Sequence, residues 1–331
     1  MSTSPANIGL GGYFSLEFGA GSPLPYFGSA AKYQSARAAM AAVLGVMRPQ
    51  TVWLPHYICG AVTEMLASRN VSVRRYVLTG ERGVPENLAI EASDVLICVD
   101  YFGISGNACE AAIARYGRER VLVDASQSLF HSPRQNVATV YSPRKFVGVP
   151  DGGLLVTPYT LPLPATADEA ASIARSQYLL TRASGQTLKG HSQFQDAEAS
   201  LSDPESQAMS VLTTGMLAAT DFDRVRRRRI ANFKNLSAAL RSLGFDSPEL
   251  PIDAVPLCCP VSDVEGRWLQ RKLSAKGIFT PIYWVDTALP EDDKIGLMLR
   301  DRTVYLPCDQ RYGGPEMAQI IDTLAKIKES T

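Results

Sequence analysis

The sequence predicts an α/β protein with three layers, in which helices cover both faces of a mostly parallel sheet, and a smaller C-terminal α/β domain. Apolar strand-like runs alternate with amphipathic stretches between about residues 33 and 157, and the alternation resumes after about residue 254. The length of 331 residues leaves room for a large and a small domain. Such alternation is typical of parallel sheets, because each crossover helix packs back on the sheet. We expect domains at 1–245 and 246–331.

The hydrophobic spacing predicts the elements of the first domain in order. The expected strands are 51–55, 71–79, 94–104, 120–129, 137–146 and 152–157. The expected helices are 33–47, 58–69 and 107–117, followed by longer helical stretches at about 166–183 and 205–243. The polar segment 185–204, which contains Gly and Ser, is expected to be a loop.

The second domain repeats the alternation on a smaller scale. The expected strands are 254–261, 278–284 and 302–307, and the expected helices are 265–277 and 315–327. Gly277 is expected to end the first of these helices, and Pro315 lies in the first turn of the second.

Composition excludes several classes of protein. The sequence has 33 Lys plus Arg and 33 Asp plus Glu, so its net charge is zero. A neutral chain shows no general preference for nucleic acid or an anionic membrane. The four consecutive arginines Arg226–Arg229 are interpreted as a solvated or interface face of a helix. The N-terminus resembles no signal peptide, and no apolar run is long enough to span a membrane. The six cysteines form no C-x-x-C motif and the three histidines are scattered, which predicts a cytoplasmic protein without a metal site.

A carboxylate follows one of the buried strands. Asp124 ends the apolar run V-L-V, at the sheet edge where open parallel sheets bind ligands. Burial of an ionised carboxylate requires a partner. A protonated pyridine nitrogen would be such a partner, and the ionic hydrogen bond would keep the ring a strong electron sink. A helix N-cap is the plain alternative for the same D-A-S-Q sequence.

A lysine follows the next strand. Lys145 ends S-P-R-K, 21 residues after the aspartate, where an amine could form an imine and move protons. Ser142 is spaced to bind a phosphate. Ser35, Ala36 and Arg37 open the first helix, whose N-terminus also favours a phosphate, although Ser35 is equally typical of a simple N-cap. Each motif is weak alone, and their order and spacing together strengthen the prediction of a site at this edge of the sheet.

The chain resembles the DegT/DnrJ group of pyridoxal-phosphate sugar aminotransferases, within the fold type I of aspartate aminotransferase. The matching segments are Y-Q-S-A-R-A-A-M, L-P-H-Y-I-C-G-A-V, V-D-A-S-Q-S-L, S-P-R-K-F-V-G-V-P-D-G-G-L-L-V-T and L-P-C-D-Q-R-Y. The resemblance implies that Lys145 is the Schiff-base lysine and that Asp124 binds the pyridine nitrogen. Further implied contacts are Gln127 near the phenolic oxygen, Ser142 with the backbone of Ala36 and Arg37 at the phosphate, and Tyr57 stacked on the ring, with Cys59 as the alternative.

The substrate end of the site is predicted from three strand ends. His56 and Tyr57, Tyr101 and Phe102, and the stretch Asp309–Tyr312 each follow a strand, so we expect them to converge on the cofactor. Tyr and His side chains suit a hydroxylated acceptor, because each buried hydroxyl needs a partner. The alternative is that these aromatic side chains pack the junction between the domains.

These features together predict a pyridoxal-phosphate aminotransferase that moves an amino group from an amino acid, with glutamate expected, to a keto-sugar or related carbonyl. Another reaction of the same cofactor, such as elimination, dehydration or a desulfurase-type step, and a non-catalytic cofactor-binding regulator remain as alternatives. A nicotinamide enzyme is disfavoured, because no G-x-G-x-x-G follows a strand. The resemblance also implies a homodimer, with GGYFSLEF (11–18) and the helix around Arg226–Arg229 as candidate contacts.

Overall fold

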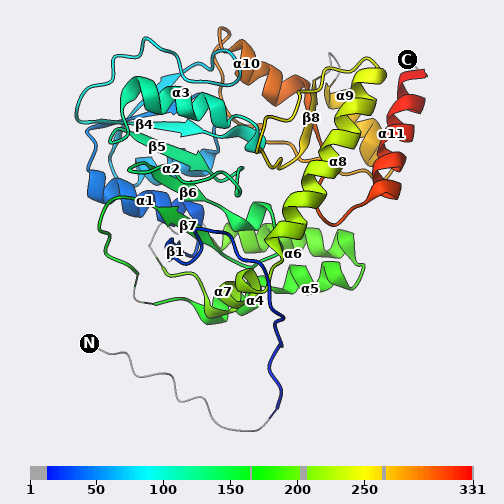
Figure 1. Ribbon diagram of the computed structural model, residues 1–331, viewed down its shortest axis with the longest axis horizontal. Coiled ribbons are helices and arrows are strands. Elements are labelled where there is room, and N and C mark those ends of the chain that lie inside the picture. The colour runs from blue at the N-terminus through cyan, green and yellow to red at the C-terminus, as the bar shows by residue number, and fades with distance from the viewer. Residues whose placement is uncertain (1–12, 165, 202–206, 263–265, 330–331) are drawn as a thin grey trace.

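The computed structural model describes residues 13–164, 166–201, 207–262 and 266–329 (Figure 1). In this part of the chain the larger sheet has seven strands in the order β1-β7-β6-β5-β4-β2-β3. The strands are β1 (Ala31–Tyr33), β2 (Thr51–Pro55), β3 (Ser72–Tyr76), β4 (Asp94–Val99), β5 (Val121–Ala125), β6 (Ala138–Tyr141) and β7 (Gly153–Val156). Strand β7 is antiparallel to both of its neighbours, and the other pairs are parallel. The sheet is therefore mostly parallel, as predicted.

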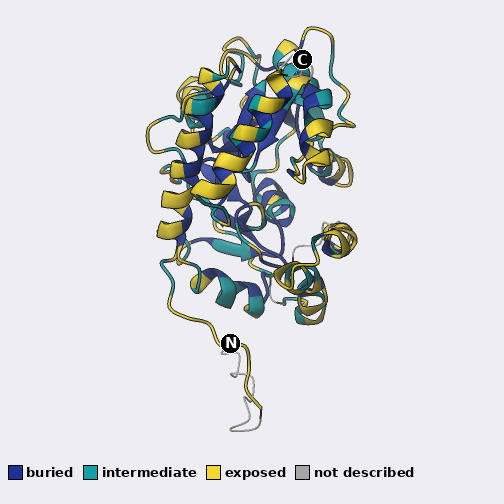
Figure 2. Ribbon diagram, turned by 90° about the vertical axis from the view of Figure 1, so that its right-hand side faces the viewer, coloured by how far each residue is buried: buried dark blue, intermediate teal, exposed yellow. Residues whose placement is uncertain are grey.

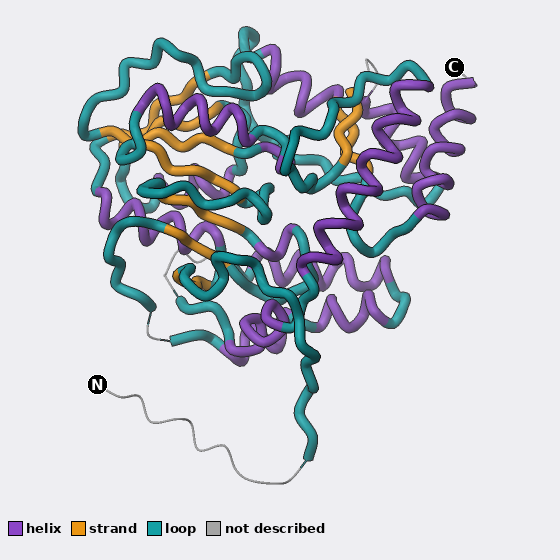
Figure 3. The backbone as a smooth tube through the Cα atoms, viewed as in Figure 1, coloured by secondary structure: helices purple, strands orange, loops and turns teal. Residues whose placement is uncertain are grey.

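Helices cover both faces of this sheet. The crossover helices are α1 (Ala36–Met47), α2 (Gly60–Ala67) and α3 (Gly106–Tyr116). The chain moves toward the β3 edge through α1 and α2 but in the opposite direction from β4 through α3 to β5. Because parallel crossovers are right-handed, α3 must lie on the face opposite α1 and α2. In agreement, α1 packs on α2, whereas α3 packs on β4 and β5 (Figure 3). The three-layer prediction is confirmed.

Five helices follow the sheet. They are α4 (Glu169–Arg175), α5 (Gln177–Ala183), α6 (Thr187–Ala199), α7 (Val211–Ala218) and α8 (Phe222–Ser242). Helix α6 lies inside the segment 185–204, so the prediction of a loop there is wrong. The segment is polar, but seven of the 13 residues of α6 are Leu, Lys, Gln, Glu or Ala, which are good helix formers, and Gly190 is the one glycine of this helix.

The C-terminal region forms a second, two-stranded antiparallel sheet of β8 (Cys259–Ser262) and β9 (Thr303–Leu306). Its helical elements are α9 (Gly266–Ala275), α10 (Lys294–Leu297), η3 (Met298–Arg302) and α11 (Gly314–Glu329). Gly277, with φ +77°, ends the turn after α9 as predicted. The predicted strand at 278–284 is wrong. Pro281 cannot donate to a sheet, Trp284 has φ 51°, and this segment instead packs its aromatic side chains.

The buried side chains form two clusters. The larger surrounds the seven-stranded sheet, and the smaller includes Phe233, Leu236 and Leu240 of α8 together with β8, β9, α9 and α11. Figure 2 shows buried residues on the inner sides of the helices and exposed ones on the outer sides. The first half of α8 contributes Phe222 to the larger cluster. The division at 245/246 remains a prediction. No helix in the described ranges is long and apolar enough to cross a membrane.

Candidate active site

Asp124 and Lys145 lie at the ends of neighbouring strands. Asp124 is the fourth residue of β5, whose partner in β6 is Val140. Lys145 ends the short 3₁₀ turn η2 (Pro143–Lys145), which begins two residues after β6. The carboxyl ends of adjacent parallel strands meet at one edge of the sheet, so both side chains are at the edge where ligands bind. Asp124 and Lys145, which are separated in the sequence, are therefore close in space.

Ser126 connects the two residues. Its backbone N–H donates to Oδ1 of Asp124 at 2.9 Å, and Nζ of Lys145 donates to its Oγ at 3.3 Å. Asp124 is only 5% exposed, whereas Lys145 is exposed in the single chain. The adjacent Arg144 forms an ion pair with Glu198 of α6. Lys145 is therefore reachable from solvent, while the carboxylate lies beneath it.

The side-chain amide of Gln127 has one hydrogen-bonded group and one group without a partner. Its side chain is fully buried, and its Oε1 accepts from the backbone N–H of Phe102 at 3.0 Å. Its Nε2 has no acceptor among the described residues. A buried donor without a partner costs on the order of 1–3 kcal/mol. An acceptor supplied by a ligand would remove that cost.

The start of α1 adjoins the lysine turn. Ser35 is the N-cap, and its Oγ accepts from the N–H of Ala38 at 3.1 Å. Ser35 also pairs with Gly152, and a Cβ placed on Gly152 would lie 3.9 Å from the ring of Pro143 in the lysine turn. A Cβ on Gly153 would lie 2.1 Å from the carbonyl oxygen of Ser35, so only glycine permits this close approach.

This approach brings together the two predicted phosphate-binding segments. Ala36 and Arg37 form the first turn of α1, whose N-terminal end carries partial positive charge. Ser142 is mostly buried and precedes Pro143 in extended conformation. The helix start, Ser142 and Lys145 therefore lie around one region of the sheet edge.

Tyr57 and Tyr101 are fully buried and belong to an aromatic cluster that also contains the partly exposed Trp284. The Tyr101 hydroxyl donates to the Tyr57 carbonyl oxygen at 2.5 Å, and the Tyr57 and Tyr305 hydroxyl oxygens are 3.3 Å apart. Trp284 packs edge-on against Tyr57, with ring centroids 4.8 Å apart. Burial raises the pKa of Tyr57, although its hydrogen bond with Tyr305 opposes this. These contacts correspond to the alternative in which the aromatic side chains pack the domain junction.

The remaining predicted substrate residues are His56 and Tyr312. Among the described residues, neither contacts Lys145. His56 is half-buried, and burial, followed by Arg75, lowers its pKa against the opposing effects of Asp293 and Asp292. Tyr312 is partly exposed and packs against the smaller hydrophobic cluster.

The stretch Asp309–Tyr312 is held together locally. The Arg311 guanidinium lies 5.2 Å from the centre of the Tyr312 ring and also pairs with Asp309. Burial alone would raise the pKa of Asp309, but its bonds to Arg311 lower it below the usual range. Asp309 therefore already has a charged partner.

Arg229 is a junction residue that the sequence interpretation missed. Arg226, Arg227 and Arg228 are exposed, but Arg229 is 2% exposed, which corrects the prediction that all four form a solvated or interface face. Its guanidinium donates to the carbonyl oxygens of Phe146, Pro256 and Leu257, and to Oε1 of Gln310. The signal was present, because position 229 falls on the apolar stripe of α8 that includes Phe222, Val225 and Phe233.

Gln310 also bonds the lysine turn. Its Nε2 donates to the carbonyl oxygen of Phe146 at 2.7 Å, the same oxygen that accepts from Arg229. Phe146 directly follows Lys145, so α8 and the segment after β9 both hold the end of this turn.

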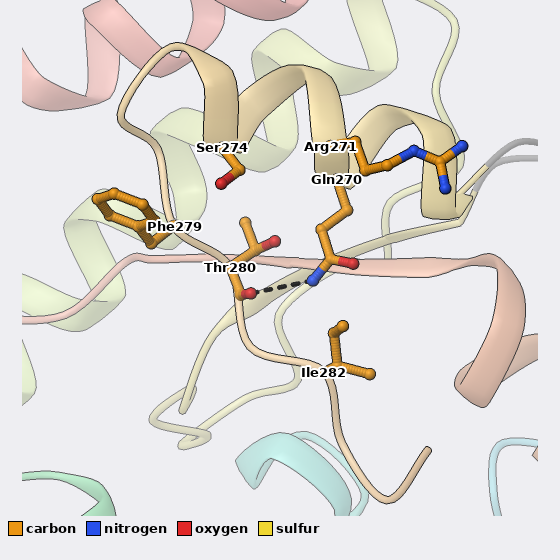
Figure 4. A pocket seen from close by; sticks show the side chains of 6 residues that line it. All are labelled: Gln270, Arg271, Ser274, Phe279, Thr280 and Ile282. Atoms are coloured by element: carbon orange, nitrogen blue, oxygen red, sulfur yellow. Dashed lines mark hydrogen bonds between the residues drawn. The ribbon is translucent and has the colours of Figure 1, made fainter. Parts of the chain in front are cut away.

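A surface hollow of about 250 Å³ lies elsewhere, between α9 and the segment that follows it (Figure 4). Its lining residues are Gln270, Arg271, Ser274, Phe279, Thr280 and Ile282. Nε2 of Gln270 donates to the carbonyl oxygen of Thr280 across it. It contains none of the predicted site residues.

Comparison with solved structures gives the fold a context. A DegT DnrJ EryC1 StrS aminotransferase from Brucella abortus has a TM-score of 0.60 at 18% identity, over 90% of this chain and 86% of that one. DesV from S. venezuelae, solved with a ketimine intermediate, gives 0.63 at 17% identity, over 91% and 85%. Spr1654 from Streptococcus pneumoniae, in its PLP form, gives 0.62 at 16% identity, over 91% and 87%. No protein-family model and no curated protein matches the sequence. At these identities the likeness establishes that this chain has the fold of these aminotransferases.

Proposed function

We propose that this chain is a pyridoxal-phosphate-dependent aminotransferase of the DegT/DnrJ type. Its substrates would be an amino-acid donor, with glutamate expected, and a keto-sugar or related carbonyl acceptor. The observation that carries the proposal is the pairing of Asp124 and Lys145 at adjoining strand ends, joined through Ser126. The fold shared with sugar aminotransferases supports it.

The residues at this edge fit pyridoxal phosphate. Nε2 of Gln127 is a buried donor that needs an acceptor, and the phenolic oxygen of the cofactor would supply one. The first turn of α1, brought close by Gly153, suits a phosphate together with Ser142. When bound, the cofactor supplies an electron sink for bond changes at the amino carbon of the substrate.

Each residue would then have a defined role. Lys145 would bind the aldehyde carbon of the cofactor, and its released amine would carry a proton at the substrate carbon. The Asp124 carboxylate would hold the proton on the ring nitrogen. Tyr57 has no exposed surface, so stacking on the ring would require the aromatic cluster to open. Cys59, partly exposed at the start of α2, is the more accessible alternative.

A homodimer would complete the site. Lys145 is exposed in the single chain, and a second subunit would shield it from water. Tyr13, Phe14 and Leu16 of GGYFSLEF are 98%, 93% and 68% exposed, and such apolar side chains are suited to a partner. Residues 11 and 12 of this segment lie outside the described residues. Light scattering should give twice the chain mass, and a stable active monomer would refute the dimer.

We also propose a cytoplasmic location, and the six free cysteines are compatible with a reducing compartment.

Borohydride reduction tests the central claim. Purified protein mixed with pyridoxal phosphate should gain visible absorbance, and reduction should fix the label to Lys145, as read by peptide mass spectrometry. A Lys145→Ala variant should lose the label, whereas a variant of the exposed Lys189 in α6, Lys189→Ala, should keep it. A label on another lysine, or no absorbance, would contradict the proposal.

A second experiment separates the alternative functions. Each of the twenty amino acids is mixed with the cofactor-loaded protein, and the absorbance is followed. Conversion to the pyridoxamine form by one amino acid, with release of its keto acid, supports transamination. Keto-acid release with the cofactor unchanged indicates elimination, and binding without turnover of any amino acid indicates a regulator.

A further inference from the structure

Ser126 occupies a position between the two principal residues of the site. Its Oγ accepts from Nζ of Lys145 at 3.3 Å, and its backbone N–H donates to Oδ1 of Asp124 at 2.9 Å. The residue is 9% exposed, so its hydroxyl is largely shielded from water. Among the described residues, this hydroxyl has no hydrogen-bond partner other than Lys145.

One of the two hydrogen bonds of Ser126 involves its backbone, and the other involves its side chain. The backbone bond to Asp124 closes a local turn, which any residue except proline could form. The bond to Lys145 depends on the side-chain oxygen alone. Because the backbone bond fixes Ser126 relative to the carboxylate, the hydroxyl defines a fixed point for the lysine amine. Without it, the long and exposed lysine side chain would be free to rotate.

We infer that Ser126 is a positioning residue that holds the amine of Lys145 whenever the lysine is not bonded to the cofactor. This inference rests on the proposed function. A neutral amine has two N–H groups and one lone pair. When Ser126 accepts one N–H, the direction of the lone pair is restricted, and it can be directed at the substrate carbon. The hydroxyl hydrogen of Ser126 remains available for a ligand or water.

The first measurement uses the cofactor-free protein. The rate of reductive methylation of Lys145 at fixed pH is read by peptide mass spectrometry in the wild type and in Ser126→Ala. Loss of the hydroxyl should speed modification roughly three- to tenfold, because the amine loses the acceptor that holds it and the lysine side chain can then move freely in solvent. Ser126→Thr, which keeps the hydroxyl, should restore the slow rate. Ser128→Ala, a buried serine of the same loop that does not bond the lysine, is the matched control.

The second measurement uses the cofactor-loaded protein and the donor half-reaction. Ser126→Ala should lower the maximal single-turnover rate constant about tenfold with little change in the apparent Kd for the donor, because only the orientation of the lysine changes. Ser126→Thr should recover most of this rate constant. Circular dichroism checks that each variant folds, and Ser126→Gly serves as a second hydroxyl-free variant if Ser126→Ala does not.

The two measurements separate this inference from the proposed function. If Ser126→Ala and Ser126→Gly methylate Lys145 at the wild-type rate, the inference is refuted even if the wild type is an active aminotransferase. If the variants change the methylation rate but the wild type binds no pyridoxal phosphate, the proposed function fails while the contact itself stands. A threonine variant that behaves like alanine would also overturn the role of the hydroxyl.

Discussion

The residues around Lys145 at the sheet edge and the aromatic residues around Tyr57 at the junction both lie near strand ends. The two regions differ in whether their polar groups are hydrogen-bonded within the chain. At the sheet edge, Nε2 of Gln127 lacks an acceptor and Lys145 extends toward solvent. At the junction, the hydroxyl of Tyr101 is bonded to a carbonyl and that of Tyr57 contacts Tyr305. The position after a parallel strand is therefore not enough to mark a binding residue. The unsatisfied Nε2 of Gln127 is a feature that the Tyr57 and Tyr101 hydroxyls of the junction lack.

The largest effect is expected at the sheet edge. Asp124→Asn should lower the donor half-reaction about a thousandfold, on the order of 4 kcal/mol of barrier, because a neutral amide stabilises a protonated ring nitrogen poorly. The amide oxygen can still accept from the N–H of Ser126, so the fold should persist. Single-turnover kinetics and thermal unfolding measure the two effects. Near-full turnover would mean that Asp124 serves only as a local cap, whose loss costs about 1 kcal/mol of stability.

A large loss of stability is expected at Arg229. Arg229→Met would leave the carbonyl oxygens of Phe146, Pro256 and Leu257 without this donor, and should cost about 3 kcal/mol of unfolding free energy. The exposed neighbour Arg227 provides the matched control, and Arg227→Met should stay within about 0.5 kcal/mol of the wild type. Urea unfolding measures both variants. Equal stabilities would show that the buried guanidinium contributes nothing to the junction.

A smaller effect is expected in the junction. Tyr101→Phe removes the bond to the Tyr57 carbonyl and should cost about 1 kcal/mol of stability. The substitution should change the rates of both half-reactions equally and slightly, because a hydroxyl buried in packing does not contact the keto acceptor. Tyr312→Phe, at a partly exposed position, is compared in the same two half-reactions. A variant that slows transfer to the keto acceptor more than reaction with the donor would place that tyrosine in the binding site.

The smallest effect concerns His56. Burial and Arg75 lower its pKa, so the folded state favours the neutral imidazole. The stability from His56 is therefore complete above its unfolded pKa of about 6.5 and is lost as the pH falls. His56→Gln should remove this loss, which is below about 1 kcal/mol for a half-buried group. Urea unfolding at about pH 7.5 and about pH 5 measures it, and an unchanged pH dependence would assign the loss to other groups.

The sequence was informative where structure is local. Asp124 lies near the end of β5 and Lys145 lies shortly after β6, and adjacent parallel strands bring their ends together. The N-cap at Ser35 and the stop at Gly277 depend on a few neighbouring residues. The places of these residues in the fold were therefore predicted correctly from pattern and turn chemistry, whereas their roles at a site remain predictions.

Long-range contacts could not be predicted in the same way. The hydroxyl of Tyr57 meets Tyr283 and Tyr305, which are 226 and 248 residues away in the chain, so its burial has no local signal. The segment 278–284 is rich in β-branched and aromatic residues, like a strand, but the cluster that receives Trp284 determines its conformation. For Ser126 and Gln127, the residue types are visible in the sequence, but only the fold shows which of their polar groups are hydrogen-bonded.

Helix α8 has a mechanical consequence. Its 21 residues span about 30 Å, with Phe222 anchored in the core of the larger sheet and Phe233, Leu236 and Leu240 in the core of the smaller one. A continuous helix transmits rotation like a rigid rod. Arg229 lies midway and is bonded to Phe146, the residue after Lys145. A movement of the C-terminal sheet that carries α8 with it would therefore displace the turn that contains Lys145 or break the bond between Arg229 and Phe146.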